Sequence, residues 1–370
     1  MAVTLKRLWT QPYRLELRSA LSWGKDHRLD QLDHVLVYAE LSNGATGVAE
    51  APPRPSIYGE TPESIAAIIA RECSDLLIGQ RIESLEDIHA AHRKLNLIRN
   101  NNTAKGALDL ALHAAFARSQ GQALADLLHV TQSRVRVSFI LGTGTLDEVL
   151  DEAQWVYECG VRVLKVKVGK DFTRETEQIR RIRQAFGDSL ELYVDANQCY
   201  TLDEADQYLP VLADLGVKWC EEPLPIHHLK QRQTLRNRGI LPLIADDSAF
   251  TLSDLAREIE FETFDVLNIK TARNGFSEAG VMLRGAQAAG KGVMVGSQAG
   301  SLLGCLHALL FSGQSGIDYP AEGTFYLKVN EAVSGALTIT DGWIDLAQAQ
   351  AVLDQLDTML LRQKTTGNLH

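Results

Sequence analysis

From residue 135 onward, two patterns of hydrophobic and polar positions alternate with a period of about 25 residues. Short apolar runs rich in β-branched residues predict buried strands, and the longer segments between them, with apolar positions three and four residues apart, predict amphipathic helices. Strands that alternate with helices predict a parallel sheet with right-handed crossovers. The predicted strands are Val135–Leu141, Val163–Val168, Leu190–Asp195, Val217–Glu221, Leu241–Asp246, Asp265–Lys270, Gly292–Gly296 and the less distinct Ser315–Tyr319. The predicted helices include Asp147–Cys159, Thr173–Phe186, Leu202–Leu215 and Ser277–Ala289.

The first 130 residues follow another plan. Val35–Leu41 and Gly47–Glu50 read as paired strands around the turn Ser42–Gly44. Helical patterns follow at Pro62–Leu77 and Ala104–Ser119. This mixture predicts an α+β domain placed before the barrel.

These patterns divide the chain into three parts. Residues 1–130 form the predicted α+β domain, and residues 131–330 the barrel, an α/β fold of the (β/α)8 or modified TIM type. Residues 331–370 return to a strand-like pattern at Ala336–Ile339 and a helical one at Ala347–Leu361. Because this segment follows the last barrel unit, we expect it to fold back and complete the first domain.

Composition narrows the range of functions. The formal net charge of −10 argues against nucleic acid or an anionic membrane surface as a partner. The sequence contains no apolar run of about 18 residues, which is the length that would predict a membrane span. The first 17 residues lack the apolar core of a signal peptide, and the five cysteines are dispersed, which together predict a cytoplasmic protein with reduced thiols.

Charged residues stand at the ends of the predicted strands, where a parallel barrel carries its catalytic groups. They are Lys165, Lys167, Asp195, Glu221, Asp246 and Lys270. From Lys167 onward their successive spacings are 28, 26, 25 and 24 residues, which follow the structural period. Each residue alone is better explained as a solvated loop residue or a helix cap, because most charged residues are simply exposed. Their common register instead predicts an active site at one mouth of the barrel.

The residue types indicate the chemistry. Asp195, Glu221 and Asp246 supply carboxylate oxygens from adjacent strands, which is typical of a site for a hard cation such as Mg²⁺. No histidine or cysteine stands at these strand ends, which argues against zinc. Glu222 is the one rival for the position of Glu221.

Lysines flank this predicted metal site. Lys165 and Lys167 are two residues apart, so both project from the same face of their strand. Lys270 comes from the sixth strand, across the mouth. A neighbouring ammonium and a divalent cation favour the neutral form of a lysine, as a base requires. One lysine can remove a proton from a planar intermediate and the other can return it to the opposite face.

Five motifs together resemble the muconate-lactonizing branch of the enolase superfamily. They are LKVKVG (Leu164–Gly169), VDAN (Val194–Asn197), EEP (Glu221–Pro223), ADDS (Ala245–Ser248) and NIK (Asn268–Lys270). The resemblance covers nearly the whole chain and implies an N-terminal capping domain over a modified barrel.

The resemblance also implies roles for individual residues. Asp195, Glu221 and Asp246 are expected to bind Mg²⁺, and Lys167 and Lys270 to form the opposed acid–base pair. Lys165 is expected to bind the substrate carboxylate and to lower the pKa of Lys167. Asn197 and Asp247 are expected to orient the ligands and lysines. A lysine base with Mg²⁺ at an ene-diolate is the known pattern of enolase-superfamily sites, so this mechanism is carried over from the family.

Within the branch, the segments around Ser297 and Asp318 resemble dipeptide epimerases, in which a D-x-D motif binds the α-ammonium of the dipeptide. Here Gly316 occupies the first aspartate position, so only Asp318 is kept and is expected to face the substrate ammonium. Ile140 stands where glutamate-specific epimerases have threonine. We therefore expect an epimerase of L-Ala-L-X dipeptides with a hydrophobic X. The alternatives are a lyase of the o-succinylbenzoate synthase or muconate cycloisomerase type, and a barrel that only binds a ligand. The resemblance further implies a homo-oligomer.

Specificity is expected to come from two capping segments, Leu21–Arg28 and Pro52–Gly59. Gly296, Gly300 and Gly304 surround a strand-to-helix transition. There they either present backbone N–H groups to an anion or allow close packing of the helix on the sheet.

Overall fold

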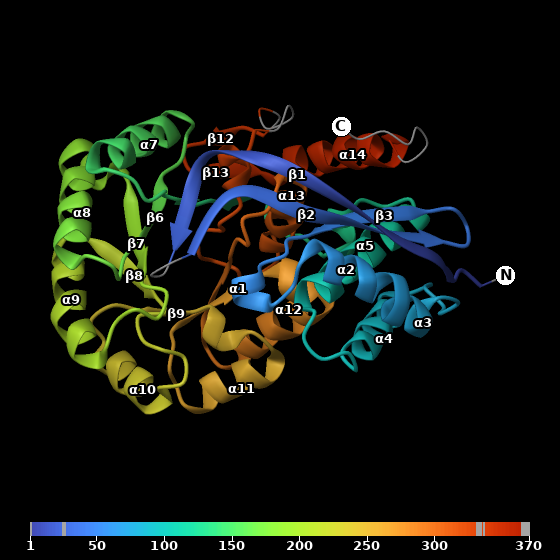
Figure 1. Ribbon diagram of the computed structural model, residues 1–370, viewed down its shortest axis with the longest axis horizontal. Helices are drawn as coiled ribbons and strands as arrows, with labels where there is room; N and C mark the ends of the chain where they lie inside the picture. The colour runs from blue at the N-terminus through green and yellow to red at the C-terminus, as the bar shows by residue number, and fades with distance from the viewer. Residues whose placement is uncertain (1, 24–26, 331–334, 336, 364–370) are drawn as a thin grey trace.

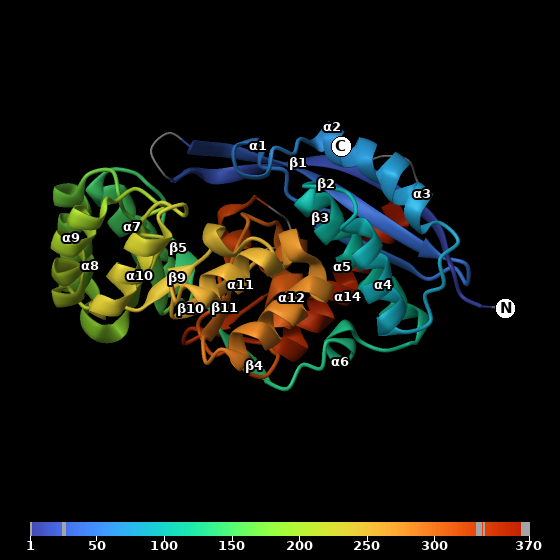
Figure 2. The same cartoon turned by 90° about the horizontal axis from the view of Figure 1, so that it is seen from below.

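The computed structural model describes residues 2–23, 27–330, 335 and 337–363. Figures 1 and 2 show two parts lying side by side. The barrel carries its helices on its outer face. The other part contains the N-terminal strands and helices, in blue and teal, together with the red C-terminal helix α14. The predicted fold class, a parallel barrel with an N-terminal capping domain, is confirmed.

The capping domain is built on a three-stranded antiparallel sheet in the order β1-β2-β3. Its strands are β1 (Leu5–Trp23), β2 (His27–Leu41) and β3 (Thr46–Ala51). The hydrophobic pattern predicted the second half of β2 and the central residues Gly47–Glu50 of β3, but it missed β1. Residues 11–18 alternate between partly buried and exposed positions, so β1 shows the period of a strand without a strongly apolar face.

The helices of the capping domain pack on this sheet. They are α1 (Pro55–Tyr58), α2 (Pro62–Ile68), α3 (Ser74–Leu77), α4 (Leu85–Leu95), α5 (Asn102–Ser119) and α6 (Leu124–Leu127), with a π-helical turn, η1 (Ile69–Cys73), between α2 and α3. The central helix α5 is buried from Thr103 to Ala117. It lies between the capping sheet and the barrel helix α12, so it has no solvent face and no amphipathic pattern.

The barrel contains seven parallel strands in the order β11-β10-β9-β8-β7-β6-β5. Their bounds are β5 (Phe139–Ile140), β6 (Val163–Lys167), β7 (Glu191–Asp195), β8 (Val217–Glu221), β9 (Leu243–Ala245), β10 (Val266–Ile269) and β11 (Gly292–Val295). The helices are α7 (Leu146–Glu158), α8 (Phe172–Phe186), α9 (Leu202–Asp214), α10 (Leu229–Arg238), α11 (Leu252–Glu260), α12 (Thr271–Ala288) and α13 (Leu302–Ser312). Short 3-10 turns are η2 (Gly187–Ser189), η3 (Asp247–Ala249) and η4 (Phe325–Lys328).

The eighth position of the barrel is filled by residues 319–322 rather than by the predicted strand Ser315–Tyr319. On one side the Glu322 N–H donates to Val295 O at 2.9 Å. On the other side the Ala321 N–H donates to Arg136 O, and the Ser138 N–H donates to Ala321 O, both at 2.8 Å. This segment therefore joins β11 to the chain before β5 and closes the ring.

The C-terminal segment contacts both parts. Strands β12 (Ile339–Thr340) and β13 (Trp343–Asp345) form a small sheet with β4 (Arg134–Arg136). Helix α14 (Leu346–Gln363) then packs on β3 and α13, and Arg118 of α5 pairs with Asp357 at 2.7 Å. Of the strand expected at Ala336–Ile339, Ala336 lies outside the described residues.

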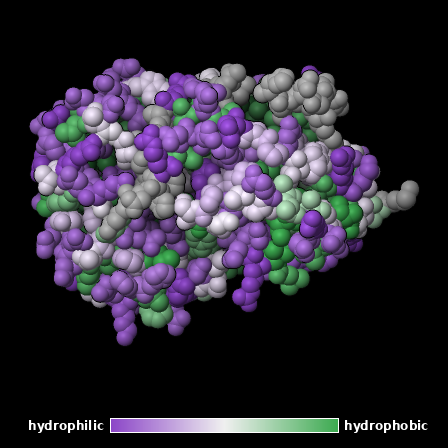
Figure 3. Space-filling model, viewed as in Figure 1, coloured by the Kyte–Doolittle hydropathy of each residue, from purple (hydrophilic) through white to green (hydrophobic). Residues whose placement is uncertain are grey.

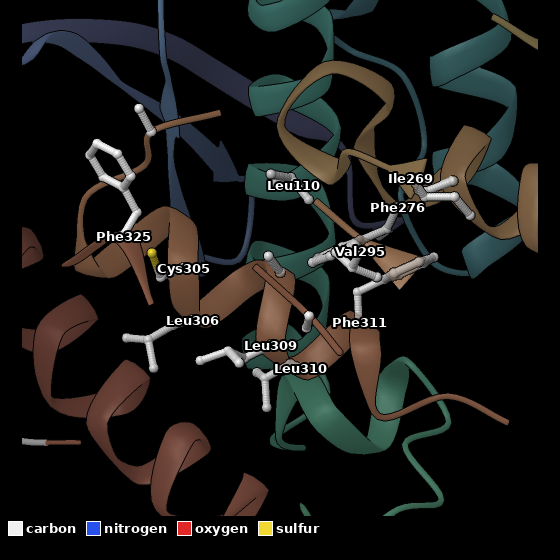
Figure 4. Close-up of a cluster of buried hydrophobic side chains, with 14 of the residues drawn as sticks. Leu110, Ile269, Phe276, Val295, Cys305, Leu306, Leu309, Leu310, Phe311 and Phe325 are labelled. Atoms are coloured by element: carbon white, nitrogen blue, oxygen red, sulfur yellow. The ribbon is translucent and has the colours of Figure 1, made fainter. Parts of the chain in front are cut away.

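The two parts share one apolar core. Figure 4 shows Leu110 of α5 beside side chains of the barrel strands and of α12 and α13. Phe276 of α12 stacks on Phe311 of α13 with ring centroids 5.9 Å apart. On the outside, Figure 3 shows mostly hydrophilic residues with scattered hydrophobic ones. None of the described helices combines the length and the apolarity that a membrane crossing requires.

Candidate active site

A cavity of about 500 Å³ lies at the C-terminal ends of the barrel strands. The capping domain contributes Arg54, Ser56, Ile57 and Tyr58 from the predicted segment Pro52–Gly59. From the other predicted segment, Leu21–Arg28, residues 24–26 lie outside the described part of the chain. Nine residues predicted from the sequence line the cavity: Ile140, Lys165, Lys167, Asp195, Asn197, Asp246, Asp247, Lys270 and Ser297.

The strand register explains why these side chains meet. Lys167 on β6 pairs with Asp195 on β7, and Asp195 pairs with Glu221 on β8. The last residues of these three strands are therefore level. Asp246 follows β9 directly, and Lys270 follows β10 and begins α12. Each predicted strand tip thus reaches the same mouth of the barrel.

Lys165 lies at the centre of the charge cluster. Its ammonium lies 2.7 Å from both Glu221 Oε1 and Glu322 Oε1, and 3.1 Å from Asp195 Oδ2. Burial alone would lower the pKa of Lys165, but the attraction of these three carboxylates raises it well above its usual value. Lys165 is therefore a fixed cation that neutralises part of the cluster.

The two predicted acid–base lysines are held by different carboxylates. The Lys167 ammonium lies 2.6 Å from Asp195 Oδ2 and donates to Asn197 Oδ1 at 3.0 Å. The Lys270 ammonium lies 2.5 Å from Asp246 Oδ2. Burial would lower the pKa of Lys270, but its pairing with Asp246 raises it. Each lysine is thus positioned by the strand next to its own.

The two adjacent glutamates at the end of β8 point to different surroundings. Glu221 is fully buried beneath the cavity, and Glu221 Oε2 accepts a hydrogen bond from Asn268 at 3.3 Å. Glu222 has a φ of 37°, and Glu222 Oε1 accepts hydrogen bonds from the Asp246 and Ser248 N–H groups. Because Glu222 is occupied by these main-chain donors, the geometry favours Glu221 as the residue directed to the cluster.

Asn197 and Asp247 also line the cavity. The Asn197 N–H donates to Asp195 Oδ1 at 2.9 Å, so Asn197 contacts both Asp195 and Lys167. Asp247 accepts a hydrogen bond from Gln198 at 3.5 Å. Burial and the charge of Asp246 raise the pKa of Asp247.

The predicted metal ligands form a crowded set of carboxylates. Among the residues that the structure describes, no three or more Asp, Glu, His or Cys side chains are arranged as a metal site. Lys165 pairs with Asp195 and Glu221, and Lys270 pairs with Asp246. The donor set nevertheless fits a hard divalent cation, because it consists of oxygens alone. Burial and the charges of Asp195, Glu322 and Asp246 raise the pKa of Glu221 well above its usual value, despite the nearby Lys165. Asn268 Oδ1 is buried close by without a hydrogen-bond partner.

Asp318 does not reach the cavity. It is exposed, and the next residue, Tyr319, donates its N–H to Val293 O, near the start of β11. Residues move toward the mouth only as the segment continues to Glu322. The prediction that Asp318 contacts the substrate therefore placed the eighth strand end four residues too early.

Glu322 is the acidic residue that sequence reasoning missed. It lines the cavity, binds Lys165, and accepts a hydrogen bond from Tyr193 Oη at 2.8 Å. The spacing could have found it, because Glu322 follows Lys270 by 52 residues, about twice the period of the other strand ends. Arg273 was also missed: it lies one turn after Lys270 and its Nη1 is 3.2 Å from Asp246 Oδ1.

Family models match both domains. Residues 148–350 match the model described as "Enolase C-terminal domain-like". Residues 26–129 match "Mandelate racemase / muconate lactonizing enzyme, N-terminal domain". The two matches follow the barrel and the capping domain, and the first covers more than half of the chain.

Individual relatives share this organisation. The chain is 26% identical over 292 residues to the L-Ala-D/L-Glu epimerase of Francisella tularensis subsp. novicida, covering 78% of this chain and 81% of that protein. It is 28% identical over 307 residues to the L-Ala-D/L-Glu epimerase of Bacillus subtilis, covering 82% of this chain and 81% of that protein.

Two solved structures are also similar to the chain over most of its length. A substrate-liganded complex of the Bacillus subtilis epimerase superposes with a TM-score of 0.86 at 26% identity, covering 92% of this chain and 96% of that one. A muconate lactonizing enzyme from Mucobacterium Smegmatis in complex with muconolactone gives a TM-score of 0.86 at 30% identity, covering 92% and 94%. The chain therefore belongs to the enolase superfamily, as an isomerase that carries the capping and barrel domains of its mandelate racemase and muconate lactonizing enzyme branch.

Proposed function

We propose that this enzyme is a Mg²⁺-dependent dipeptide epimerase, which inverts the α-carbon next to the C-terminal carboxylate. The observation that carries the proposal is the placement of Lys167 and Lys270 on one cavity. Lys167 ends β6 and Lys270 follows β10, with the carboxylate-bearing strand ends between them in the sheet order. Two amines that approach a substrate carbon from separate strands are the requirement for proton transfer between its two faces.

The chain's own residues account for each proton. A neutral lysine takes the α-proton and becomes an ammonium, while the electrons of the C–H bond move toward the substrate carboxylate. The opposite lysine, which starts as an ammonium, then gives its proton to the other face of the planar carbon. The stereocentre is inverted, and the two lysines have exchanged protonation states.

Asp195, Glu221 and Asp246 would hold the cation in this proposal. Bound Mg²⁺ supplies positive charge that offsets these carboxylates and the charge that develops on the substrate carboxylate. The pairs of Lys167 with Asp195 and of Lys270 with Asp246 would then weaken, which favours a neutral amine. We assign the binding of the substrate carboxylate to Lys165, which lines the cavity and pairs with two of these ligands, Asp195 and Glu221.

The cavity lining supports a hydrophobic side chain at X. Its apolar members come from the cap, the first strand and the barrel loops: Ile57, Tyr58, Ile140, Ile226, Phe250 and Phe325. Among the described cap residues that line the cavity, Arg54 is the one cation that could select an acid. Its guanidinium is already bound to Pro53 O, Gln298 O and Ala299 O. We therefore propose L-Ala-L-X dipeptides with an apolar X as substrates.

Incubation with Ala-X dipeptides in D₂O, with Mg²⁺ present, tests this proposal. Mass spectrometry should detect a gain of about one mass unit at the α-carbon, accompanied by formation of the other epimer. Each lysine variant should exchange the α-proton of one epimer only. Lys167→Ala should exchange the proton of one epimer without inversion, and Lys270→Ala should exchange only the other epimer. Lys230→Ala, at an exposed lysine of α10, is the matched control and should behave as the wild type.

Unchanged inversion in both active-site variants would remove the two-lysine mechanism. A muconate cycloisomerase-type reaction is the second candidate. The muconate lactonizing enzyme from Mucobacterium Smegmatis is 30% identical to this chain, whereas the Bacillus subtilis epimerase in its solved structure is 26% identical. That reaction needs one base, so it predicts very unequal losses in the two variants and no exchange into dipeptides. Consumption of cis,cis-muconate, followed by its ultraviolet absorbance, separates the two functions.

A further inference from the structure

The capping domain contains a buried row of three polar side chains that the proposed proton transfer does not use. Glu50 of β3, His34 of β2 and Arg54 before α1 are 1%, 0% and 6% exposed. His34 Nδ1 lies 3.4 Å from Glu50 Oε2, and His34 Nε2 lies 3.1 Å from Arg54 Nη2. The imidazole therefore connects the carboxylate to the guanidinium, and these residues are called the Glu50–His34–Arg54 row below.

Both ends of the row bind the barrel loop between β11 and α13. Arg54 Nη2 donates to Gln298 O at 2.8 Å and to Ala299 O at 3.1 Å. Glu50 Oε1 accepts the Ser301 N–H at 2.9 Å, and the Ser301 hydroxyl donates to Glu50 Oε2. The cap thus holds residues 298–301 at two points.

Glu50 also explains two of the glycines singled out in the sequence. A Cβ atom on Gly304 would overlap Glu50 Oε1, and one on Gly300 would approach it to 2.8 Å. The start of α13 does present a backbone N–H group to an anion, as one of the two interpretations held. The anion is the chain's own Glu50, so this position is not free for a ligand.

The loop connects the row to the active site. Ser297, Gln298 and Ala299 all line the cavity. The Ser297 N–H donates to Glu322 Oε2 at 2.8 Å, and the other oxygen of Glu322 binds Lys165. Ala299 has a φ of 55°, a left-handed conformation that a non-glycine residue keeps only when its surroundings enforce it.

Hydrogen-bond chemistry determines the protonation of His34. A guanidinium can only donate, so His34 Nε2 must accept from Arg54 and cannot carry a proton. Nδ1 then carries the proton and donates to Glu50. The charged groups that face His34 are Glu50 and Asp33, which favour its cation, and Arg54, which opposes it. The Tyr13 ring meets the imidazole edge-on at 5.9 Å.

We propose that Arg54 is a positioning residue, which fixes the active-site loop through the main-chain carbonyls of Gln298 and Ala299 and requires an uncharged His34 to do so. Burial lowers the pKa of His34 below its usual value, so the row is intact at neutral pH. A proton on Nε2 would face the donors of Arg54 and place two cations in contact. Acidification therefore releases Arg54 from His34 and loosens its hold on the loop. This inference goes beyond the proposed function.

Hydrogen–deuterium exchange of the full chain, without substrate, tests the inference. The reporter is the peptide that covers residues 296–304, because the N–H groups of Ser297, Ala299 and Ser301 are all hydrogen-bonded here. Arg54→Met should speed exchange of this peptide about tenfold at about pH 7.5, after correction for intrinsic rates. The matched control is Arg93→Met in α4, at a 62% exposed guanidinium, and it should leave the reporter unchanged.

The second arm tests the role of His34. In the wild type, protection of the reporter should fall about tenfold between about pH 7.5 and about pH 5, while a peptide from α8 keeps its protection. His34→Gln can accept from Arg54 and donate to Glu50 at both pH values, so its reporter should stay protected. An equal acid response in the wild type and in His34→Gln would overturn the inference, as would wild-type protection in Arg54→Met.

Should Arg54→Met fail to fold, the comparison of the wild type with His34→Gln still decides the matter. Arg54→Lys offers a third measurement, because its ammonium keeps the charge but lacks the planar guanidinium, in which Nη1 binds Pro53 O while Nη2 reaches two loop carbonyls and the imidazole. Its reporter should exchange faster than that of the wild type. None of these readouts needs enzymatic activity, so a failed epimerase assay would leave them unaffected.

Discussion

The Lys165 ammonium lies 2.7 Å from Glu322 Oε1, and this ion pair joins the second strand of the barrel to the segment that closes it. Glu322 is 3% exposed and has further donors: Tyr193 Oη and the Ser297 N–H, each at 2.8 Å. One carboxylate therefore holds a lysine of β6, a tyrosine of β7 and the loop after β11. The position of Lys165 relative to Glu221 depends on this residue.

Glu322→Gln should destabilise the protein by about 1–3 kcal/mol, because it directs an amide N–H group toward existing donors, while Lys165 keeps its pairs with Asp195 and Glu221. Urea unfolding measures the difference. The matched control is Glu177→Gln on α8, a 43% exposed carboxylate, which should change the free energy of unfolding by less than about 0.5 kcal/mol. Any dipeptide exchange should fall at least about tenfold in Glu322→Gln, since Lys165 loses one of the three carboxylates that position it. Equal stability of the two variants would contradict this account of Glu322.

The strand ends could be found from the sequence because the parallel register repeats them. Lys167, Asp195 and Glu221 are level in adjacent strands, and equal helical crossovers separate them along the chain. Glu322 was missed because the eighth position contains Tyr319 to Glu322 with a proline inside, and so lacks an apolar run. The spacing of about 25 residues between successive strand ends is therefore a better guide to that position than a search for an apolar run.

Contacts between domains leave no local pattern. Glu50 is separated from Ser301 by 251 residues, and Arg54 from Gln298 by 244. Nothing in the neighbourhood of Glu50 indicates that it binds the start of α13. The glycines at 300 and 304 predicted an anion or a close approach, but their partner became visible only when the two domains were placed together.

Two helical glycines should respond oppositely to alanine. At Gly304 in α13 an added Cβ would overlap Glu50 Oε1, so Gly304→Ala should displace the carboxylate and lower the free energy of unfolding by about 1–3 kcal/mol. At Gly280 in α12 the nearest atom to an added Cβ is Arg284 Nη1, at 3.5 Å. Gly280→Ala should therefore stabilise the protein by up to about 1 kcal/mol through helix propensity. Urea unfolding measures the free energy of unfolding of both variants. Destabilisation by Gly280→Ala would show that helix propensity does not determine the effect of alanine at this position.

His92 should make the stability depend on pH in the alkaline range. Its Nδ1 lies 3.2 Å from Asp109 Oδ1 and its Nε2 lies 3.5 Å from Glu278 Oε2, so it joins α4 to α5 and to the barrel helix α12. Neither contact has the geometry of a good hydrogen bond, so we treat both as ion pairs. Burial would lower the pKa of His92, but the two carboxylates raise it to about 9.

A histidine whose pKa is higher in the folded state stabilises the protein below its unfolded pKa, and this contribution is lost as the pH rises through the folded value. The wild type should therefore lose up to about 3 kcal/mol of this contribution between about pH 6.5 and about pH 9. Urea unfolding across this range should show a flatter dependence for His92→Gln. His227→Gln, at an exposed histidine, is the control and should keep the wild-type slope. A slope unaffected by His92→Gln would mean that other groups govern alkaline stability.

Mg²⁺ should stabilise the folded chain even when no substrate is present. Asp195, Glu221 and Asp246 are buried at the ends of the neighbouring strands β7, β8 and β9, and a divalent cation that binds them only in the folded state adds about 2.7 kcal/mol when its concentration is about 100 times the dissociation constant. Thermal unfolding in Mg²⁺, compared with unfolding in a chelator, measures this shift without any assay of activity. Asp246→Asn should abolish most of the shift, because it removes one ligand charge. Asp147→Asn in α7, with a side chain that is 89% exposed, should retain the full shift. Equal shifts in the two variants would place the cation elsewhere, and no shift in the wild type would contradict the proposed ligand set.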